Sequence, residues 1–458
     1  MIQADDRAQG LTTAGQHGSA RSGSGTAHQL VQTLGANLAL ALLGFITGPL
    51  VARLLGPGGR GELAAIQTLP SFIASLAMLG LPDAVVYFSA REPGQAGTFW
   101  LSGTTLSLLA APVFFGVGYA IMPLALAAQS PSTIAAGRVY LLLIPVFALS
   151  GMALQTLRGR RDLLAWNLFR IAPGLCWLAL LLFVATGHGR SAPGWLATHY
   201  LVIQGLLIVP VVLLVMRRIR GPFRPQASVF RPMLRFGLPS VGGSVPQALN
   251  QRLDQMLMAA LLGPHALGLY AVAVTWSSAM SPALSAFGMV AFPHVAAQTS
   301  DESKAHSALL TTRLASLAAA CLTVVLYAVT PLFLPLIFGA DFGESVMSAR
   351  ILVVAAGFLG LSLVLEDTLR GLGQPTAVLK SEAIGLVFTV ALLAVLLGPL
   401  GIVGAAIASL CGYSATAAVL IHYVKGRLGC SHRSVVLPTS AEVDLLRRYA
   451  SAALGRAS

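Results

Sequence analysis

Charged side chains are scarce in this sequence: they make up 10% of its 458 residues, whereas a soluble domain usually carries about 25%. Apolar residues make up 56%, and the mean hydropathy is +0.78. This composition excludes an ordinary soluble domain and is typical of an integral membrane protein. Negatively charged residues are the rarer kind: there are 16 aspartates and glutamates against 29 lysines and arginines. The basic residues lie in short segments between apolar stretches, which indicates a topology signal rather than a nucleic-acid-binding surface.

The sequence has few features of enzymes or metal sites. Its four cysteines form no Cys-x-x-Cys pair and three lie in apolar segments, so we expect neither a disulfide framework nor a zinc site. It contains no nucleophile motif, metal-ligand cluster or glycine-rich phosphate loop, and we interpret GPGGRG (56–61) as a turn on the outer side of the membrane. The sequence therefore predicts a protein with no catalytic residues, no metal and no cofactor.

The first 28 residues have no apolar run of the kind found in a cleavable secretory signal. They are polar and rich in Gly, Ser, Thr and Gln. This composition predicts a disordered tail over residues 1–28.

Long apolar segments fill most of the remaining chain. A helix needs about 20 apolar residues to cross the ~30 Å hydrocarbon layer. We predict an all-α integral membrane protein with about twelve transmembrane helices, in two six-helix bundles at 29–216 and 234–424 joined by a basic cytoplasmic linker at 217–233. The expected spans are 31–54, 63–89, 98–127, 138–157, 163–186, 195–216, 234–262, 269–297, 308–338, 349–369, 377–398 and 401–424.

Lysine and arginine fall mainly on one side of this arrangement. If the N-terminus is cytoplasmic, 22 of the 29 lie on the cytoplasmic side, 5 lie on the outer side, and Arg170 and Arg252 lie within spans. Because positive charge is retained in the cytoplasm, we predict that both termini are cytoplasmic. The tail 425–458 is expected to carry a short amphipathic helix, which begins at the capping-box pattern of Thr439 and Glu442.

Two four-residue motifs occur twice, at the same places in the span count. LLGP at 54–57, followed by Gly61, recurs at 261–264, followed by Gly268, and TLRG at 156–159 recurs at 368–371. Because both matches fall at equivalent places in the topology, they indicate that the last six spans repeat the first six. Repeated halves of transporters usually meet around a central cavity near the middle of the membrane.

The stretches VARLLGPGGRGELAAI (51–66) and RLDQMLMAALLGPHALGLYAVA (252–273) resemble the two half-openings of Wzx-type polysaccharide flippases. LQTLRGRRD (154–162) and LGLPDAVVYFSAR (79–91) are similar too. These flippases belong to the multidrug/oligosaccharidyl-lipid/polysaccharide exporter superfamily, and the likeness covers roughly residues 30–425.

The resemblance implies a multi-pass protein of the inner membrane that moves a lipid-diphosphate-linked oligosaccharide to the outer leaflet by alternating access, coupled to H⁺ or Na⁺. We expect a monomer in contact with membrane lipids, with a polysaccharide polymerase as a candidate partner and no nucleic acid. Two alternatives stay open: a drug or small-cation antiporter of the same fold, and a membrane glycan polymerase or ligase. A cationic cavity would favour the flippase, an acidic one would favour the drug antiporter, and a large outer loop would favour the enzyme.

The seventh span carries the clearest polar pattern. If 234–262 is one continuous helix, a set of polar and small residues falls on one face of it, and lipid cannot cover that face. We predict that this face lines a hydrated cavity, with a polar seam against a neighbouring helix as the alternative. The set is Ser240, Gly243, Gln247, Asn250, Gln251 and Asp254.

Charged residues within spans are costly and therefore candidates for function. Arg252 is a candidate ligand for a phosphate or acidic sugar, or else a partner in an ion pair between helices. Asp254 is the candidate for ion coupling. Arg170 is a candidate substrate contact near the cytoplasmic entrance, unless it only stacks on Trp166. Arg53 is a candidate at the cavity exit, or an interfacial anchor.

Four further charged residues are interpreted as structural. Glu366, Asp367 and Arg370 are spaced so that the arginine can neutralise both carboxylates locally. Glu382 follows Lys380 at the start of a span, and we expect it at the membrane interface.

Overall fold

The computed structural model describes residues 6–219, 221–287, 298 and 300–437, and every regular element in these ranges is a helix. The helices, with three 3₁₀ turns, are α1 (Asp6–Ala77), α2 (Leu81–Arg91), η1 (Pro93–Gln95), α3 (Ala96–Ala125), α4 (Pro131–Tyr140), α5 (Leu143–Gly159), α6 (Leu163–Ala185), α7 (Pro193–Leu206), α8 (Ile208–Arg218), α9 (Ala227–Asn250), α10 (Leu253–Leu261), α11 (Pro264–Ser277), η2 (Ser278–Met280), α13 (Asp301–Phe338), η3 (Ala340–Phe342), α14 (Ser345–Gly371), α15 (Pro375–Leu428) and α16 (His432–Val436).

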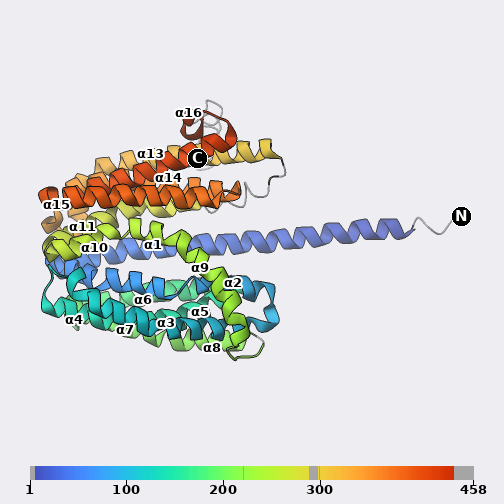
Figure 1. Ribbon diagram of the computed structural model, residues 1–458, viewed down its shortest axis with the longest axis horizontal. Helices are drawn as coiled ribbons and strands as arrows, with labels where there is room; N and C mark the ends of the chain where they lie inside the picture. Colours follow the sequence, from blue (N-terminus) through green and yellow to red (C-terminus); the bar gives the residue numbers. More distant parts are fainter. Residues whose placement is uncertain (1–5, 220, 288–297, 299, 438–458) are drawn as a thin grey trace, which may run out of the picture.

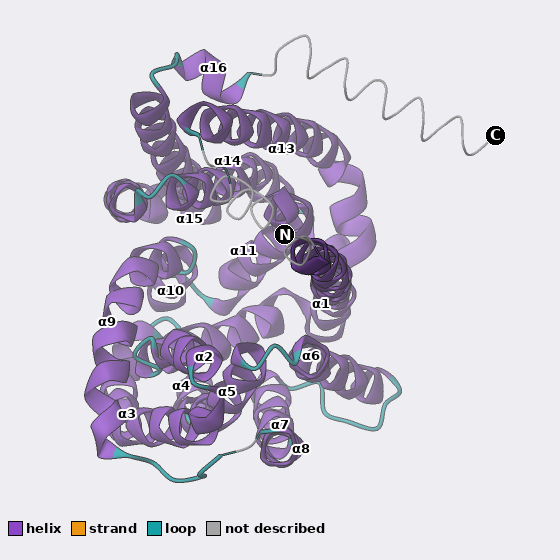
Figure 2. Ribbon diagram, turned by 90° about the vertical axis from the view of Figure 1, so that its right-hand side faces the viewer, coloured by secondary structure: helices purple, strands orange, loops and turns teal. Residues whose placement is uncertain are grey.

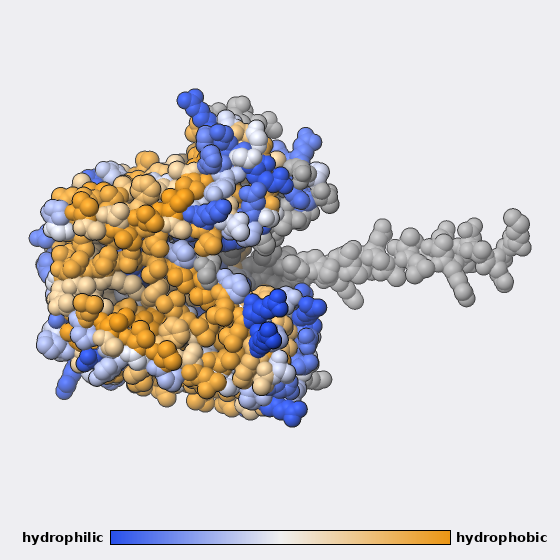
Figure 3. Space-filling model, in the orientation of Figure 1, coloured by the Kyte–Doolittle hydropathy of each residue, from blue (hydrophilic) through white to orange (hydrophobic). Residues whose placement is uncertain are grey.

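Nine helical stretches in the described part of the chain are long and apolar enough to cross a membrane. They turn large apolar side chains outward: Leu109, Leu124, Val324 and Val395 are each about two-thirds exposed or more. Figure 3 shows a broad apolar area across the visible face of both groups of helices. Soluble monomers do not expose apolar patches of this extent, so the predicted all-helical, multi-span membrane fold is confirmed.

The helices form two groups (Figures 1 and 2). One group holds α2–α8, and the other holds α11 and α13–α16. Helix α1 packs against α6 of the first group and α11 of the second, and α9 packs against α2 and α3 at one end and α15 at the other. The space between the groups is therefore bounded by α1 and α9, and the candidate site lies there.

Two of the nine stretches are too long for one crossing. From Gln32 to Ala77, α1 has 46 residues, and α15 has 54; at 1.5 Å per residue these would be ~69 Å and ~81 Å long. Each contains one residue with non-helical backbone angles, Gly56 in α1 and Gly401 in α15, both at positive φ. Glycine adopts positive φ without steric cost, so each long helix is interrupted at this residue.

Two local expectations differ from the described structure, and a third is untested. The segment GPGGRG was expected to be a turn, but only Gly56 leaves the helix; Pro57 occupies the first position of the next helical segment, which suits its missing N–H. The predicted disordered tail belongs to α1 from Asp6 onward, and no proline interrupts the helix between Asp6 and Gln32. The amphipathic helix expected after Thr439 lies outside the described residues.

Candidate functional site

A polar cavity of about 510 Å³ lies between helices of the first group, α1 and the segment where α9 joins α10. Its walls come from α1, α4–α5, α7 and the junction of α9 with α10. Two arginines line it, and neither aspartate nor glutamate is among its described lining residues. The polar and aromatic lining residues are Arg60, Gln67, Thr68, Ser71, Phe72, Ser75, Tyr140, Phe147, Tyr200, Gln204, Gln251, Arg252 and Gln255.

Arg252 reaches this cavity because the seventh span is broken. Helix α9 ends at Asn250, α10 begins at Leu253, and Arg252 between them has φ −129° and ψ −17°. The break changes which side chains share a face, so the expectation of one continuous helix was wrong. Gln251, Arg252 and Gln255 line the cavity. A cavity position was predicted for Gln251, and Arg252 was predicted as a candidate ligand for a phosphate or acidic sugar.

Arg60 is a cavity residue that the sequence analysis missed, because it was assigned to an outer turn. It lies one helical turn beyond Gly56, on the helical continuation of α1, and lines the same cavity as Arg252. Its Nε is buried and has no hydrogen-bond partner in the described part of the chain. A buried donor without a partner is costly, which points to a ligand that accepts a hydrogen bond. The signal in the sequence was Pro57, which favours a helix starting before Arg60.

Asn250 and Asp254, two residues of the predicted face, do not line the cavity. Asn250 and Asp254 are 2% and 3% exposed and lie against the second group of helices. Asp254 accepts hydrogen bonds from Tyr270 of α11, Ser409 of α15 and its neighbour's backbone N–H. Its carboxylate is therefore satisfied by protein donors, and its predicted role in ion coupling stays a prediction.

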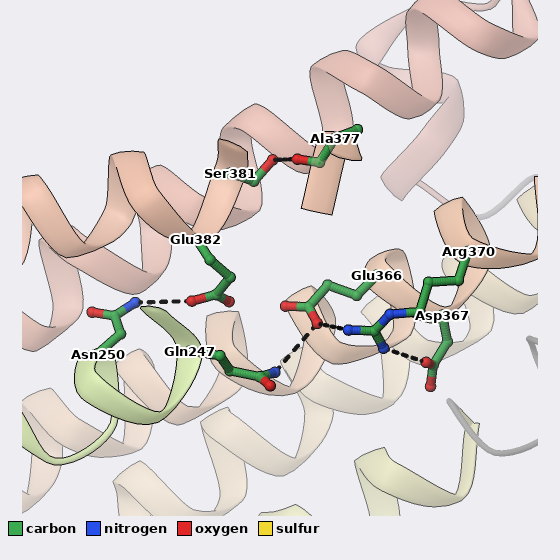
Figure 4. Close-up of polar contacts among 8 residues, drawn as sticks. All are labelled: Gln247, Asn250, Glu366, Asp367, Arg370, Ala377, Ser381 and Glu382. Atoms are coloured by element: carbon green, nitrogen blue, oxygen red, sulfur yellow. Dashed lines mark hydrogen bonds and ion pairs between the residues drawn. The ribbon is translucent and has the colours of Figure 1, made fainter. Parts of the chain in front are cut away.

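Gln247 and Asn250 connect α9 to two buried carboxylates (Figure 4). Gln247 Nε2 donates to Glu366 Oε2 at 3.2 Å, and Asn250 Nδ2 lies 3.5 Å from Glu382 Oε2. Asn250 Oδ1 also accepts from Thr389 at 2.8 Å. These contacts match the polar seam that was the alternative to a hydrated wall, and the predicted substrate contacts of both side chains are untested.

Glu366 on α14 and Glu382 on α15 are 1% and 2% exposed, and Figure 4 shows their carboxylates pointing toward each other. Glu382 was expected at the membrane interface; in the structure α15 turns its side chain inward, against Asn250 of α9. Arg370 pairs with Glu366 at 2.9 Å and with Asp367 at 2.8 Å, as its spacing predicted. One arginine thus serves two carboxylates, which leaves the charge of Glu382 without a cation among these contacts. Two facing carboxylates are stabilised when they share a proton.

Arg170 lies beside an apolar cavity of about 500 Å³ that shares Ser75, Phe147 and Gln204 with the polar one. Its guanidinium stacks 4.3 Å from the Trp166 ring centroid, as the structural alternative anticipated. It also donates to Asn167 at 3.1 Å and Asn37 at 2.9 Å. The structure therefore places Arg170 at the wall of an adjoining chamber, already held by protein acceptors.

Arg53 lines none of these cavities. Its guanidinium donates to the backbone carbonyls of Leu336 and Ile337, at the C-terminal end of α13. The structure thus places Arg53 at a contact between the two halves of the chain, and its predicted role as a substrate ligand is untested.

Known proteins resemble this chain in sequence and in fold. A family model described as "Polysaccharide biosynthesis protein" matches residues 50–347. The EPS I polysaccharide export inner membrane protein EpsE of Ralstonia solanacearum is 29% identical over 44% of this chain and 48% of its own length. The succinoglycan biosynthesis transport protein ExoT of Rhizobium meliloti is 23% identical over 72% of this chain. The matched part spans about half of EpsE and 66% of ExoT.

Solved structures of two transporter groups share the fold. The lipid II flippase MurJ in an inward closed conformation aligns with a TM-score of 0.68 at 14% identity, over 86% of this chain and 87% of its own. An inward-facing MATE-family multidrug transporter aligns with a TM-score of 0.63 at 17% identity, over 87% and 94%. The family model and the export and transport relatives, together with this shared fold, confirm the predicted resemblance and the prediction of a transporter rather than an enzyme. With a family model that covers most of its length, the chain belongs to the polysaccharide biosynthesis protein family of membrane transporters.

Proposed function

We propose that this protein moves lipid-diphosphate-linked oligosaccharide precursors from the inner to the outer leaflet of the bacterial inner membrane, for export of a surface polysaccharide. The charge of the polar cavity carries the proposal: Arg60 and Arg252 line it, and no described lining residue is acidic. A diphosphate offers the oxygens that two guanidinium groups bind best. A cationic drug would meet repulsion in the same place, which disfavours the antiporter alternative.

The polymerase or ligase alternative lacks support in the described part of the chain. Connections at the end of the molecule that carries Gly56 and Gly401 are short, such as 126–130 and 186–192. A catalytic outer loop of substantial size is therefore not formed by the described residues.

Deletion of the gene tests the proposal in the cell. We expect loss of the surface polymer and accumulation of lipid-linked oligosaccharide on the cytoplasmic leaflet, with unchanged susceptibility to cationic drugs. Restored export from a plasmid copy controls for effects on neighbouring genes. A deletion strain that exports normally but becomes drug-sensitive would establish the antiporter instead.

We further propose twelve spans with both termini in the cytoplasm. Helices α1 and α15 each contribute two spans, because ~69 Å and ~81 Å of helix exceed twice the ~30 Å hydrocarbon layer and each bends at its glycine. Helices α9 and α10 together supply one more, whose polar side chains keep it outside the nine apolar stretches. With this count the halves hold six spans each, at 29–216 and 234–424.

Cysteine labelling tests the topology. In a protein without its four native cysteines, Arg224→Cys in the basic linker is expected to react with an impermeant maleimide only after the cells are permeabilised. His188→Cys, in the short connection after α6, is expected to react in intact cells. Both positions are exposed in the structure, so failure to react reports sidedness rather than burial. Labelling of Arg224→Cys in intact cells would overturn the orientation.

A second cavity, an apolar groove, could hold the lipid chain of the proposed substrate. An apolar groove of about 870 Å³ lies between α1 and the α11–η2 segment, and Arg252 lines both this groove and the polar cavity. Apolar side chains such as Leu38, Leu42 and Phe45 form its α1 wall. A substrate with a charged head and an isoprenoid tail would place its diphosphate beside Arg252 while its tail remains in an apolar surrounding.

We also propose proton coupling through Glu366 and Glu382. These carboxylates hold Gln247 and Asn250 of α9, and the break at Arg252 follows directly after Asn250. Uptake or release of a shared proton would change the contacts that fix the end of α9. The charged cavity residue is therefore mechanically linked to the protonation of the pair.

A further inference from the structure

Gly61 and Gly268 occupy the same position in the two copies of the repeated motif, and the structure brings them into mutual contact. A Cβ atom added to Gly61 would lie 1.8 Å from the carbonyl oxygen of Pro264 and 2.7 Å from the amide nitrogen of Gly268. A Cβ atom added to Gly268 would lie 1.8 Å from the carbonyl oxygen of Pro57 and 2.9 Å from the amide nitrogen of Gly61. Each helical segment therefore approaches the other at a point where only glycine fits.

Two polar contacts between the halves lie near this crossing, and both cap the end of a helix. The buried Gln129, just after α3, donates from Nε2 to the carbonyls of Ala259 and Leu262 at 3.1 Å and 3.0 Å. Arg53 donates to carbonyls at the end of α13. The last carbonyls of a helix have no partner within it and carry the negative end of its dipole. Side chains of the first half thus satisfy helix ends of the second half.

These contacts close one end of the polar cavity. Arg60, which lines the cavity, directly precedes Gly61, and Gln255 lies one turn before Ala259 on α10. Figure 1 shows α10 and α11 meeting at the end of the molecule opposite the N-terminus. In the proposed topology this is the outer end, through which the substrate head leaves.

We propose that the reciprocal contact of Gly61 and Gly268 is the outer closure of the transport cavity, that Gln129 and Arg53 hold it shut, and that the two glycines separate when the cavity opens outward. The inference rests on the proposed transport function. It also assigns Arg53 to the closure instead of to the substrate. The freed carbonyls and donors would then be hydrated at the outer surface, so the closure can open and reform.

The chain offers matched glycines for the test. Gly58 and Gly263 lie in the same two motif copies, and a Cβ atom added to either would meet nothing within 4 Å. Gly61→Ala and Gly268→Ala place a methyl group against backbone that cannot rotate away, whereas Gly58→Ala and Gly263→Ala do not. All four changes add the same group to the same repeats, so their difference isolates the crossing.

The measurement is the reaction of Thr68→Cys, a cavity position, with an impermeant maleimide added outside intact cells that express the otherwise cysteine-free protein. We expect Gly61→Ala and Gly268→Ala to raise the labelling rate by about tenfold, which corresponds to a ~1.4 kcal/mol shift between two states. Gly58→Ala and Gly263→Ala should leave it unchanged. Labelling in inverted vesicles confirms that each variant is inserted and that its cysteine is reactive.

Unchanged outside labelling in inserted Gly61→Ala and Gly268→Ala variants would overturn the closure. If either variant fails to insert, Gln129→Ala decides, because it removes two contacts across the closure without adding bulk and should also raise outside labelling. The assay uses no polysaccharide substrate. Glycine variants that open the cavity, together with a deletion strain that exports normally, would therefore reject the proposed substrate and retain the closure.

Discussion

Replacement of Arg252 by alanine is expected to reduce polysaccharide export by at least about tenfold while the protein remains in the membrane. A hydrogen bond to a charged group contributes about 1.5–3 kcal/mol, and 1.4 kcal/mol corresponds to a factor of ten. Arg252→Lys should retain part of the function, because lysine keeps the charge but not the bidentate geometry. The readout is surface polymer per unit of membrane-inserted protein.

Arg60 is expected to act together with Arg252, since both line one cavity. The double substitution Arg60→Ala/Arg252→Ala should abolish export. Arg350→Ala is the matched control, because Arg350 stacks on Tyr327 and lines none of the three cavities. Export at the wild-type level by inserted Arg252→Ala protein would show that this arginine is structural.

The membrane potential itself favours outward movement of the anionic head group. The arginines of the cavity are therefore needed to lower the barrier to transport rather than to supply energy for it. A diphosphate carries about two negative charges, and each is worth ~2.3 kcal/mol per 100 mV. In a cell whose interior is negative by 100 mV, outward movement of both charges is therefore electrically favourable by about 4–5 kcal/mol. The barrier that remains is desolvation of the head, which Arg60 and Arg252 would lower by replacing water around the phosphate oxygens.

Glu366→Gln and Glu382→Gln are each expected to remove the stimulation of transport by an inward proton gradient. Their transport rate with the gradient should be close to their rate without it. Glutamine keeps the size and hydrogen-bonding capacity of the side chain but cannot bind or release a proton. The measurement compares transport in vesicles with and without an acidic exterior. Asp367→Asn is the control, because Asp367 also pairs with Arg370 but is more exposed, at 29%.

If a proton gradient still stimulates transport in both glutamate variants, proton coupling lies at another residue. Asp254→Asn is then the variant to measure. Loss of stimulation in Asp367→Asn as well would mean that the ion pair with Arg370, rather than a proton on the glutamates, is what transport requires.

The sequence predicted the helical membrane fold because apolar length and flanking charge report the membrane directly. It also identified the repeat, and the structure shows why the shared glycine matters: Gly61 and Gly268 touch each other. Arg252 was singled out as a charge within a span, and it does line the central cavity.

The remaining details depend on backbone breaks and tertiary packing that periodicity does not encode. The helical wheel failed at span seven because α9 ends at Asn250, so Gln251 and Asp254 do not share a face. Arg60 was misplaced because four glycines within the six residues 56–61 suggested a longer turn than the single break at Gly56. Glu382 looked interfacial beside Lys380, and only the packing of α15 on α9 shows that it is buried.

The cationic cavity is proposed to carry an anionic, lipid-linked head group. Transport by the purified full-length chain in proteoliposomes tests it most directly, with a fluorescent lipid-diphosphate-linked oligosaccharide whose leaflet is read by an impermeant quencher, and with a cationic dye as the competing cargo. We expect the wild-type protein to move the lipid-linked oligosaccharide, Arg60→Ala/Arg252→Ala not to move it, and neither protein to move the dye. Movement of the dye without movement of the oligosaccharide would contradict this proposal.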